Sequence, residues 1–224
     1  MQPPTILCST VADGSMKART DDHMDDVTHN REVFLTAHDI AIADTTLVRL
    51  VYEGTDYCRY ATVSEASKGD GTVHHSTMTA DAMVVTQPGH ALFLPLADCV
   101  GAVLYDPTKG ILMLSHLGRH NLEQFGATKS VGFLVNEHGV DPKNLTVWLS
   151  PAASKVFYPV YAFNNRSLHN VTAEQLLAAG VTHDKIETSP IDSAADPNYY
   201  SHSQFLKGNR PDDGRFAVVA MMTN

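Results

Sequence analysis

Four apolar runs of strand length follow one another between residues 82 and 115, and they constrain the fold more than any other feature of the chain. Short segments rich in proline, glycine and aspartate separate them at residues 87–89, 97–99 and 106–110. Apolar runs bounded by turn residues are typical of strands. The pattern therefore predicts consecutive strands at Ala82–Thr86, Ala91–Leu96, Val100–Tyr105 and Ile111–Ser115.

Two earlier runs, Leu47–Tyr52 and Tyr57–Val63, are rich in β-branched and aromatic residues. Residues 53–56 between them have turn composition, so this region is predicted to form a hairpin. The polar stretch Ser64–Thr79 that follows is predicted to be a long loop.

The rest of the chain alternates helical and strand-like segments. A polar loop is expected at residues 12–26, and Gly139 is expected to end the longest helix. The other strands are predicted at Thr5–Thr10, Leu145–Leu149 and Phe216–Met221, and the helices at Val27–His38, Asn121–Glu137 and Thr172–Ala179. This order predicts an α/β (α+β) fold, with residues 1–224 forming a single layered domain of mixed β-sheet and flanking helices.

Charge and cysteine content exclude several classes of protein. Acidic residues outnumber basic ones, 25 against 16, which gives a net charge of −9 and no electrostatic footprint for nucleic acid or anionic membrane. No apolar stretch approaches the ~20 residues of a spanning helix, and the N-terminus lacks the features of a signal peptide. Three cysteines without CxxC spacing do not make a disulfide scaffold or a zinc ribbon. A cytoplasmic protein is expected.

Common catalytic motifs are missing from the sequence: GxGxxG after a strand, a Walker loop, GxSxG and HExxH. The remaining candidate is Cys99 with His116, which lie at two predicted strand ends. Such a pair is either a nucleophile with its base or two metal ligands. A third interpretation is structural, with Cys99 a small buried apolar residue and His116 capping a carbonyl group.

Two other positions have both a functional and a structural interpretation. Asp98 either orients a ligand or stabilises the turn that precedes Cys99. Residues 198–202, which include Ser201 and His202, either line a polar pocket or anchor the C-terminal strand.

At these residues the sequence resembles the laccase-domain family, also described as polyphenol-oxidase-like or as bacterial purine nucleoside phosphorylases. The family shows D-A, P-G, T/L-A-D-C and A-H-A-G-W-R-G segments in this order. The corresponding segments here are at residues 80–83, 88–89, 97–99 and 115–118, with an ungapped C-x16-H spacing. Residues 8–15, 149–152 and 200–215 resemble the opening, L-G-P-A-I and closing segments of the family.

The resemblance implies a layered α/β fold near toxin-type cysteine hydrolases. It implies a zinc ion held by His, Cys and His, and phosphorolysis of purine nucleosides or deamination of adenosine, so the expected ligands are a purine nucleoside and phosphate. The older family name implies a copper-dependent phenol oxidase. The sequence supports that activity less well, because it contains no His-x-His pair.

By this resemblance Cys99 and His116 are metal ligands and catalytic residues. Glu53 aligns with the histidine of the family's Q-V-H-G segment and is the expected third ligand, with His75 on the long polar loop as the alternative. We predict that Glu53 lines the Cys99–His116 pocket and that His74 and His75 face solvent.

Five more residues take expected roles by position. Asp98 would orient a ligand, and Arg119, where the family has W-R, would act in catalysis. Arg215, Ser201 and His202 would bind substrate or phosphate. Two alternatives to a zinc enzyme remain: a degenerate binding protein that kept only the fold, and a metal-free Cys99–His116 hydrolase.

Overall fold

The computed structural model describes residues 2–17, 24–76 and 78–223. Within these residues, ten strands form two sheets. The small sheet has four strands in the order β1 (Thr5–Cys8), β10 (Phe216–Met221), β5 (Ala91–Leu96) and β2 (Thr45–Leu47). The large sheet has six, in the order β3 (Tyr60–Thr62), β4 (Ala82–Val85), β7 (Ile111–Leu117), β6 (Val100–Asp106), β8 (Thr146–Leu149) and β9 (Ile186–Thr188).

Both sheets are mixed. In the small sheet, β10 runs antiparallel to β1 and β5, whereas β2 runs parallel to β5. In the large sheet the central pairs are antiparallel, and the edge strands β3 and β9 are parallel to their neighbours.

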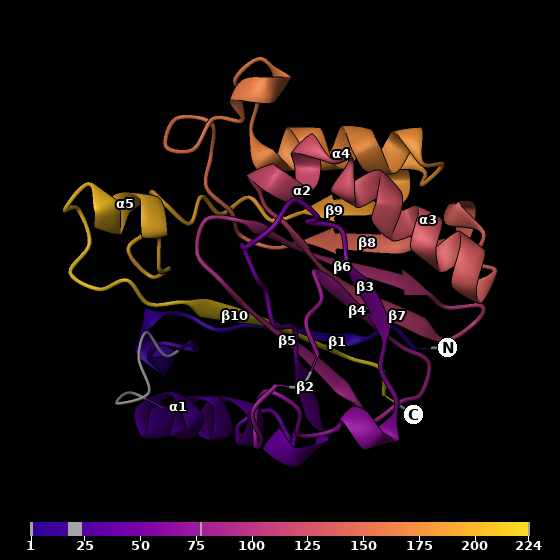
Figure 1. Ribbon diagram of the computed structural model, residues 1–224, viewed down its shortest axis with the longest axis horizontal. Coiled ribbons are helices and arrows are strands. Elements are labelled where there is room, and N and C mark those ends of the chain that lie inside the picture. The colour runs from indigo at the N-terminus through magenta and orange to yellow at the C-terminus, as the bar shows by residue number, and fades with distance from the viewer. Residues whose placement is uncertain (1, 18–23, 77, 224) are drawn as a thin grey trace.

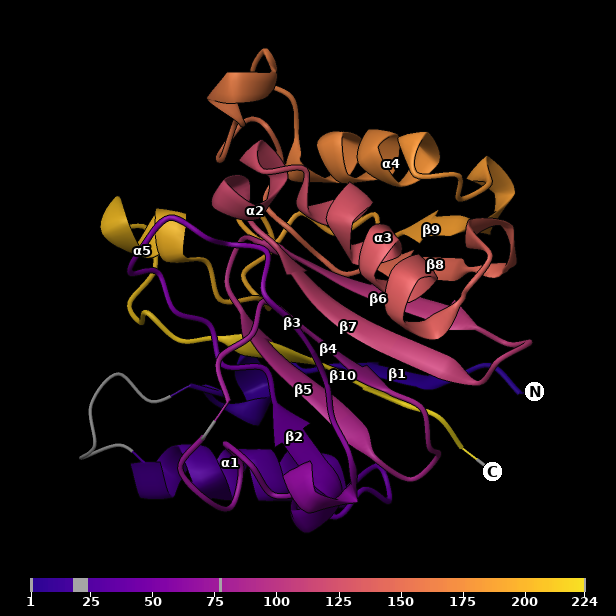
Figure 2. The same ribbon diagram turned by 45° about the vertical axis from the view of Figure 1, so that its right-hand side comes forward.

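The two sheets stack face to face, and helices cover both outer faces (Figures 1 and 2). Helix α1 (Met24–Thr36) packs on the small sheet, and α3 (Gly126–His138) and α4 (Leu168–Ala178) pack on the large one. The short helices α2 (Arg119–Glu123) and α5 (His202–Leu206) lie at one end of the stack. The molecule is thus a four-layer α/β/β/α arrangement.

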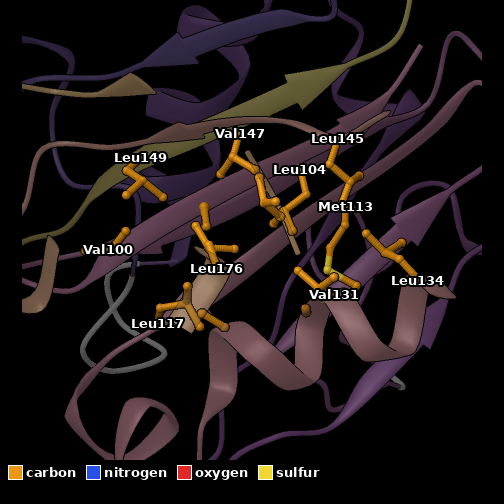
Figure 3. Packing of buried hydrophobic residues seen from close by; sticks show 14 of the residues in the cluster. Val100, Leu104, Met113, Leu117, Val131, Leu134, Leu145, Val147, Leu149 and Leu176 are labelled. Atoms are coloured by element: carbon orange, nitrogen blue, oxygen red, sulfur yellow. The ribbon is translucent and has the colours of Figure 1, made fainter. Parts of the chain in front are cut away.

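The core strands are largely apolar because both of their faces are buried. Along β5, Leu92 and Leu94 point between the sheets, whereas Phe93 points toward α1. Along β7, Leu112 and Leu114 meet the small sheet, and Met113 packs under the helices. Figure 3 shows this second packing layer, in which Met113 lies near Val131 and Leu134 of α3. Strands buried on both faces lose the alternating polar pattern of half-exposed strands.

The predicted layered α/β fold is confirmed, and the strands divide between two sheets. The four central runs form β4, β5, β6 and β7 within one or two residues of their expected bounds. In the described residues, the stretch at 64–79 has a 3-10 turn and one isolated bridge but no strand of either sheet, as the predicted loop requires. The sequence prediction missed β9 and α5, which are three and five residues long.

The predicted hairpin at Leu47–Tyr52 and Tyr57–Val63 is wrong. Of the first run, only Leu47 is in a strand, as the last residue of β2 in the small sheet, and residues 48–52 form no strand. The second run contributes β3 to the large sheet. Each short strand pairs in parallel with a longer buried strand, β5 or β4, instead of with its neighbour in sequence. Local turn composition predicted the pairing, but burial against the two sheets determined it.

The predicted helix Asn121–Glu137 is two helices, α2 and α3. Phe125 between them has a left-handed backbone, with φ of 61°. A Cβ on Gly126 would lie 2.7 Å from the backbone oxygen of Asn121, so the close approach of the two helices requires glycine there. The third predicted helix begins earlier than expected, at Leu168, with Ser167 as its N-cap. None of the helices in the described residues is long and apolar enough to cross a bilayer.

Gly101 of β6 lies where the two sheets approach each other closely. A Cβ there would lie 2.8 Å from Leu96 of β5 and 3.3 Å from Val218 of β10. We expect Gly101→Ala to lower the free energy of unfolding by about 1–3 kcal/mol, because an added methyl group overpacks the contact. Urea denaturation measures this loss.

Gly132→Ala is the matched control, because the same methyl group would meet nothing within 4 Å on α3. Replacing a helical glycine with alanine should raise stability by about 0.5–1 kcal/mol. Equal effects of the two substitutions would contradict the proposed contact between the sheets.

Candidate functional site

A cavity of about 300 Å³ lies at the end of the stack where α2 and α5 are found. The chain passes from β5 to β6, and so from one sheet to the other, through residues 97–99, which line the cavity. The end of β7 and the start of α2 supply the adjacent wall, with His116, Gly118 and Arg119. Tyr52, Tyr158, His202 and Arg215 approach from other segments.

Strand register brings Cys99 and His116 together. In the β6–β7 pair, Val100 lies opposite Leu117, so Cys99 before β6 adjoins Gly118 after β7. A Cβ on Gly118 would lie 2.8 Å from Sγ of Cys99 and 3.3 Å from Nε2 of His116. The thiol and the imidazole therefore border one small space, which exists because residue 118 has no side chain.

Burial keeps both groups uncharged near neutral pH. Burial, with a smaller contribution from Asp98, raises the pKa of the Cys99 thiol to about 12, although Arg215 and Arg119 act in the opposite direction. Burial lowers the pKa of His116 to about 4. The apo pair is therefore a thiol beside a neutral imidazole, which is not the thiolate–imidazolium pair of an activated cysteine hydrolase.

His116 is held by its backbone and by its neighbours. Its N–H donates to the carbonyl of Asp81 at 2.8 Å, and Tyr52 meets its ring edge-on at 6.4 Å between centroids. The amide of Asn121 is already engaged with Gly118 and Tyr57. In the described part of the chain, the buried Nδ1 of His116 has no hydrogen-bond partner.

A sulfur and an imidazole nitrogen form a donor set that suits zinc or copper. Catalytic zinc sites ordinarily combine three protein ligands with an open position. Among the described residues, no third Cys, His, Asp or Glu joins Cys99 and His116. The described chain therefore offers two ligands and does not complete a three-ligand zinc site.

Neither expected third ligand joins the pair. Glu53 is exposed and does not line the cavity, whereas its neighbour Tyr52 does. His74 and His75 are exposed on the polar loop and do not line the cavity either.

Asp98 connects the crossover to α5. Its backbone is left-handed, with φ of 79°, and its side chain is buried. Its carboxylate accepts a hydrogen bond from the hydroxyl of Ser201 at 2.5 Å and one from the N–H of Ser203 at 2.7 Å. Asp98 thus anchors the start of α5, and Ser201 is buried as the N-cap of that helix and does not line the cavity.

Among the described residues, the lysine and arginine side chains that line the cavity are Lys17, Arg119 and Arg215. Desolvation and repulsion by Arg215 lower the pKa of Lys17, as expected for like charges that share a small space. Arg119 lies 4.0 Å from Glu123 on α2 and acts on the thiol of Cys99 electrostatically. This concentration of positive charge occurs in a chain whose net charge is −9.

His202 lies at the start of α5, and Asp213 orients it. Nδ1 of His202 lies 2.7 Å from Oδ1 of Asp213, which also accepts a hydrogen bond from Arg215 at 2.8 Å. Burial would raise the pKa of Asp213, but the contacts with His202 and Arg215 outweigh it and lower that pKa.

Sequence reasoning missed four residues of the site: Lys17, Tyr52, Tyr158 and Asp213. Lys17 lies in a polar loop and Tyr158 in an irregular segment, and neither carries a motif. Asp213 lies in a Pro-Asp-Asp-Gly turn, where an aspartate has a sufficient structural explanation. Only Tyr52 had a signal, since it adjoins the residue aligned with the family's histidine.

The family model described as "multi-copper polyphenol oxidoreductase laccase" matches residues 9–166, which is more than half of the chain. The chain belongs to this laccase-domain family. Two solved structures of similar fold are the hypothetical protein YfiH of Bacillus licheniformis and YlmD of Geobacillus stearothermophilus. Their sequences are 19% and 21% identical to this chain, and their TM-scores against it are 0.83 and 0.82. The matches cover 93% and 94% of this chain and 85% of each solved chain.

Two curated relatives carry the name purine nucleoside phosphorylase. The Corynebacterium glutamicum protein is 30% identical over 112 residues, which cover 50% of this chain and 44% of that protein. The Streptomyces coelicolor protein is 31% identical over 134 residues, or 60% of this chain and 51% of that protein. The chain thus spans about half the length of the curated relatives it matches.

The contact between Gly118 and Cys99 predicts a coupled effect on stability. We expect Gly118→Ala to destabilise the protein by about 1–3 kcal/mol, because its methyl group would press on the thiol and the imidazole. In a Cys99→Ala background the same substitution should cost less, since the sulfur has been removed. Urea denaturation of both single variants and the double variant measures this coupling, and strictly additive effects would disprove the contact.

Proposed function

We propose that this laccase-domain chain is a purine nucleoside phosphorylase, which transfers the ribosyl group of a purine nucleoside to inorganic phosphate. The observation that carries the proposal is the group of three cations, Lys17, Arg119 and Arg215, around one cavity of a net-negative chain. Phosphate is the anionic substrate that such a group would bind. The names of the two curated relatives support the same reaction.

The remaining lining suits the nucleoside. Tyr52 and Tyr158 give the cavity aromatic surface on which a purine ring can stack, and Leu50 and Pro95 add apolar wall. A volume of about 300 Å³ lies at the lower end of the range for small-molecule sites. A planar base, a ribose and a phosphate thus have complementary surfaces within one cavity.

Cys99 and His116 are the two ligands that this chain would offer a zinc ion, which would supply a Lewis acid near the reacting groups. Because the described residues do not complete the ligand set, the proposal assigns no step to an ion. Cys99 and His116 lie at the end of the cavity where the reaction would occur. Asp98 positions Cys99, because both residues belong to the crossover between the two sheets.

The direct test supplies inosine and phosphate to the purified protein and measures hypoxanthine and ribose 1-phosphate. We expect hypoxanthine only when phosphate is present, and loss of turnover in Cys99→Ser and His116→Ala while thermal unfolding stays cooperative. Adenosine separates the two reactions that the family resemblance implies, because phosphorolysis yields adenine and deamination yields inosine. Nucleoside binding without any product would instead indicate a degenerate binding protein.

Arg119→Gln tests the phosphate site. Loss of a charge-assisted hydrogen bond of about 1.5–3 kcal/mol should raise the KM for phosphate about tenfold or more, with a smaller effect on the KM for inosine. Arg166→Gln is the matched control, because Arg166 forms a surface ion pair with Glu174 and does not line the cavity. An unchanged phosphate KM in Arg119→Gln would remove Arg119 from the phosphate site.

A further inference from the structure

His202 and Asp213 form a hydrogen-bonded pair on the α5 side of the cavity. Nδ1 of His202 lies 2.7 Å from Oδ1 of Asp213. The Asp213 carboxylate is nearly buried, with 11% of its side chain exposed, whereas 44% of the His202 side chain is exposed. The carboxylate is therefore a fixed element, and the imidazole is the accessible one.

The carboxylate determines which nitrogen of His202 can act. A carboxylate against Nδ1 holds the proton on that atom, so that Nε2 is the atom left to exchange a proton. Arg215 hydrogen-bonds the same Oδ1 at 2.8 Å and keeps the carboxylate in place. A histidine oriented in this way by an ionised carboxylate is the arrangement that enzymes use for general acid–base catalysis.

His202 has this arrangement, whereas the other accessible histidine of the cavity does not. His120 stacks on Tyr57 at 4.8 Å between ring centroids, and its Nδ1 lies 3.7 Å from Glu123. That separation is beyond hydrogen-bond distance. His120 therefore lacks the orienting contact that His202 has.

Phosphorolysis of a purine nucleoside needs an acid. When the bond between C1′ and N9 breaks, its electron pair goes to the purine, which leaves as an anion unless N7 takes up a proton. A phosphate oxygen forms the new bond to C1′, and the proton that this phosphate gives up can restore the acid. The products are then the neutral base and ribose 1-phosphate, and atoms and charge balance.

We infer that His202, positioned by Asp213, is the general acid that protonates N7 of the leaving purine. This inference rests on the proposed function, since it assigns the proton donor of that same reaction. Among the described residues, the charged or titratable groups that line the cavity, together with Asp213, are Lys17, Tyr52, Asp98, Cys99, His116, Arg119, His120, Tyr158, His202 and Arg215. The cations favour phosphate, and Asp213 orients the imidazole through its Nδ1.

A nucleoside that needs no proton tests the role directly. In 7-methylguanosine, N7 is already methylated and cationic, so the base leaves without an acid. We expect His202→Gln to lower kcat for inosine by about 10²–10⁴-fold, the usual contribution of a general acid, and to keep most of the wild-type rate on 7-methylguanosine. The two substrates are compared at one pH with saturating phosphate.

Asp213→Asn tests the positioning residue. Without the carboxylate, Nδ1 of His202 loses the charged acceptor that orients the ring, so kcat for inosine should fall while the KM for inosine stays near its wild-type value. The rate on 7-methylguanosine should change little. His183→Gln is the matched control, because His183 is exposed and lies outside the cavity, and both substrates should react at wild-type rates.

The outcomes separate the two proposals. If wild-type protein cleaves neither nucleoside, the proposed function fails. If wild-type protein cleaves both but His202→Gln loses both equally, or loses neither, the reaction stands and the assignment of His202 as general acid is overturned.

Discussion

The functional end of the molecule depends on one constrained residue, Asp98. The chain must pass from the small sheet to the large sheet within residues 97–99, and it does so with Asp98 in a left-handed conformation. For a residue other than glycine this conformation costs on the order of 1 kcal/mol or more. Hydrogen bonds from Ser201 and Ser203 to the carboxylate, and from Ala153 to the carbonyl, offset that cost.

The same hydrogen bonds determine where two parts of the site lie. On one side of Asp98, the crossover delivers Cys99 to the end of β7, where His116 and the space beside Gly118 are found. On the other side, the contact with Ser201 holds the first turn of α5 and therefore His202. Asp98 thus connects the thiol–imidazole pair to the His202–Asp213 pair. Its role is to position these residues.

Electrostatics distinguishes this end of the molecule from the rest of the chain. The net charge is −9, yet Lys17, Arg119 and Arg215 line one cavity of about 300 Å³. Like charges in so small a space repel one another, and an anion between them relieves that repulsion. The cations and two tyrosines line this cavity together with Cys99 and His116.

The sequence by itself determined the central strands, because residues buried on both faces leave continuous apolar runs that turn residues interrupt. It also determined that Cys99 and His116 would meet, since the start of the first strand of an antiparallel hairpin lies opposite the end of the second. Only the tertiary structure decided the partners of β2 and β3, the break at Phe125 and the pairing of His202 with Asp213. These features depend on contacts between segments distant in sequence or on a close approach of the backbone. Such contacts leave no local pattern of residues in the sequence. For the same reason Tyr52, and not Glu53, came to face the imidazole of His116.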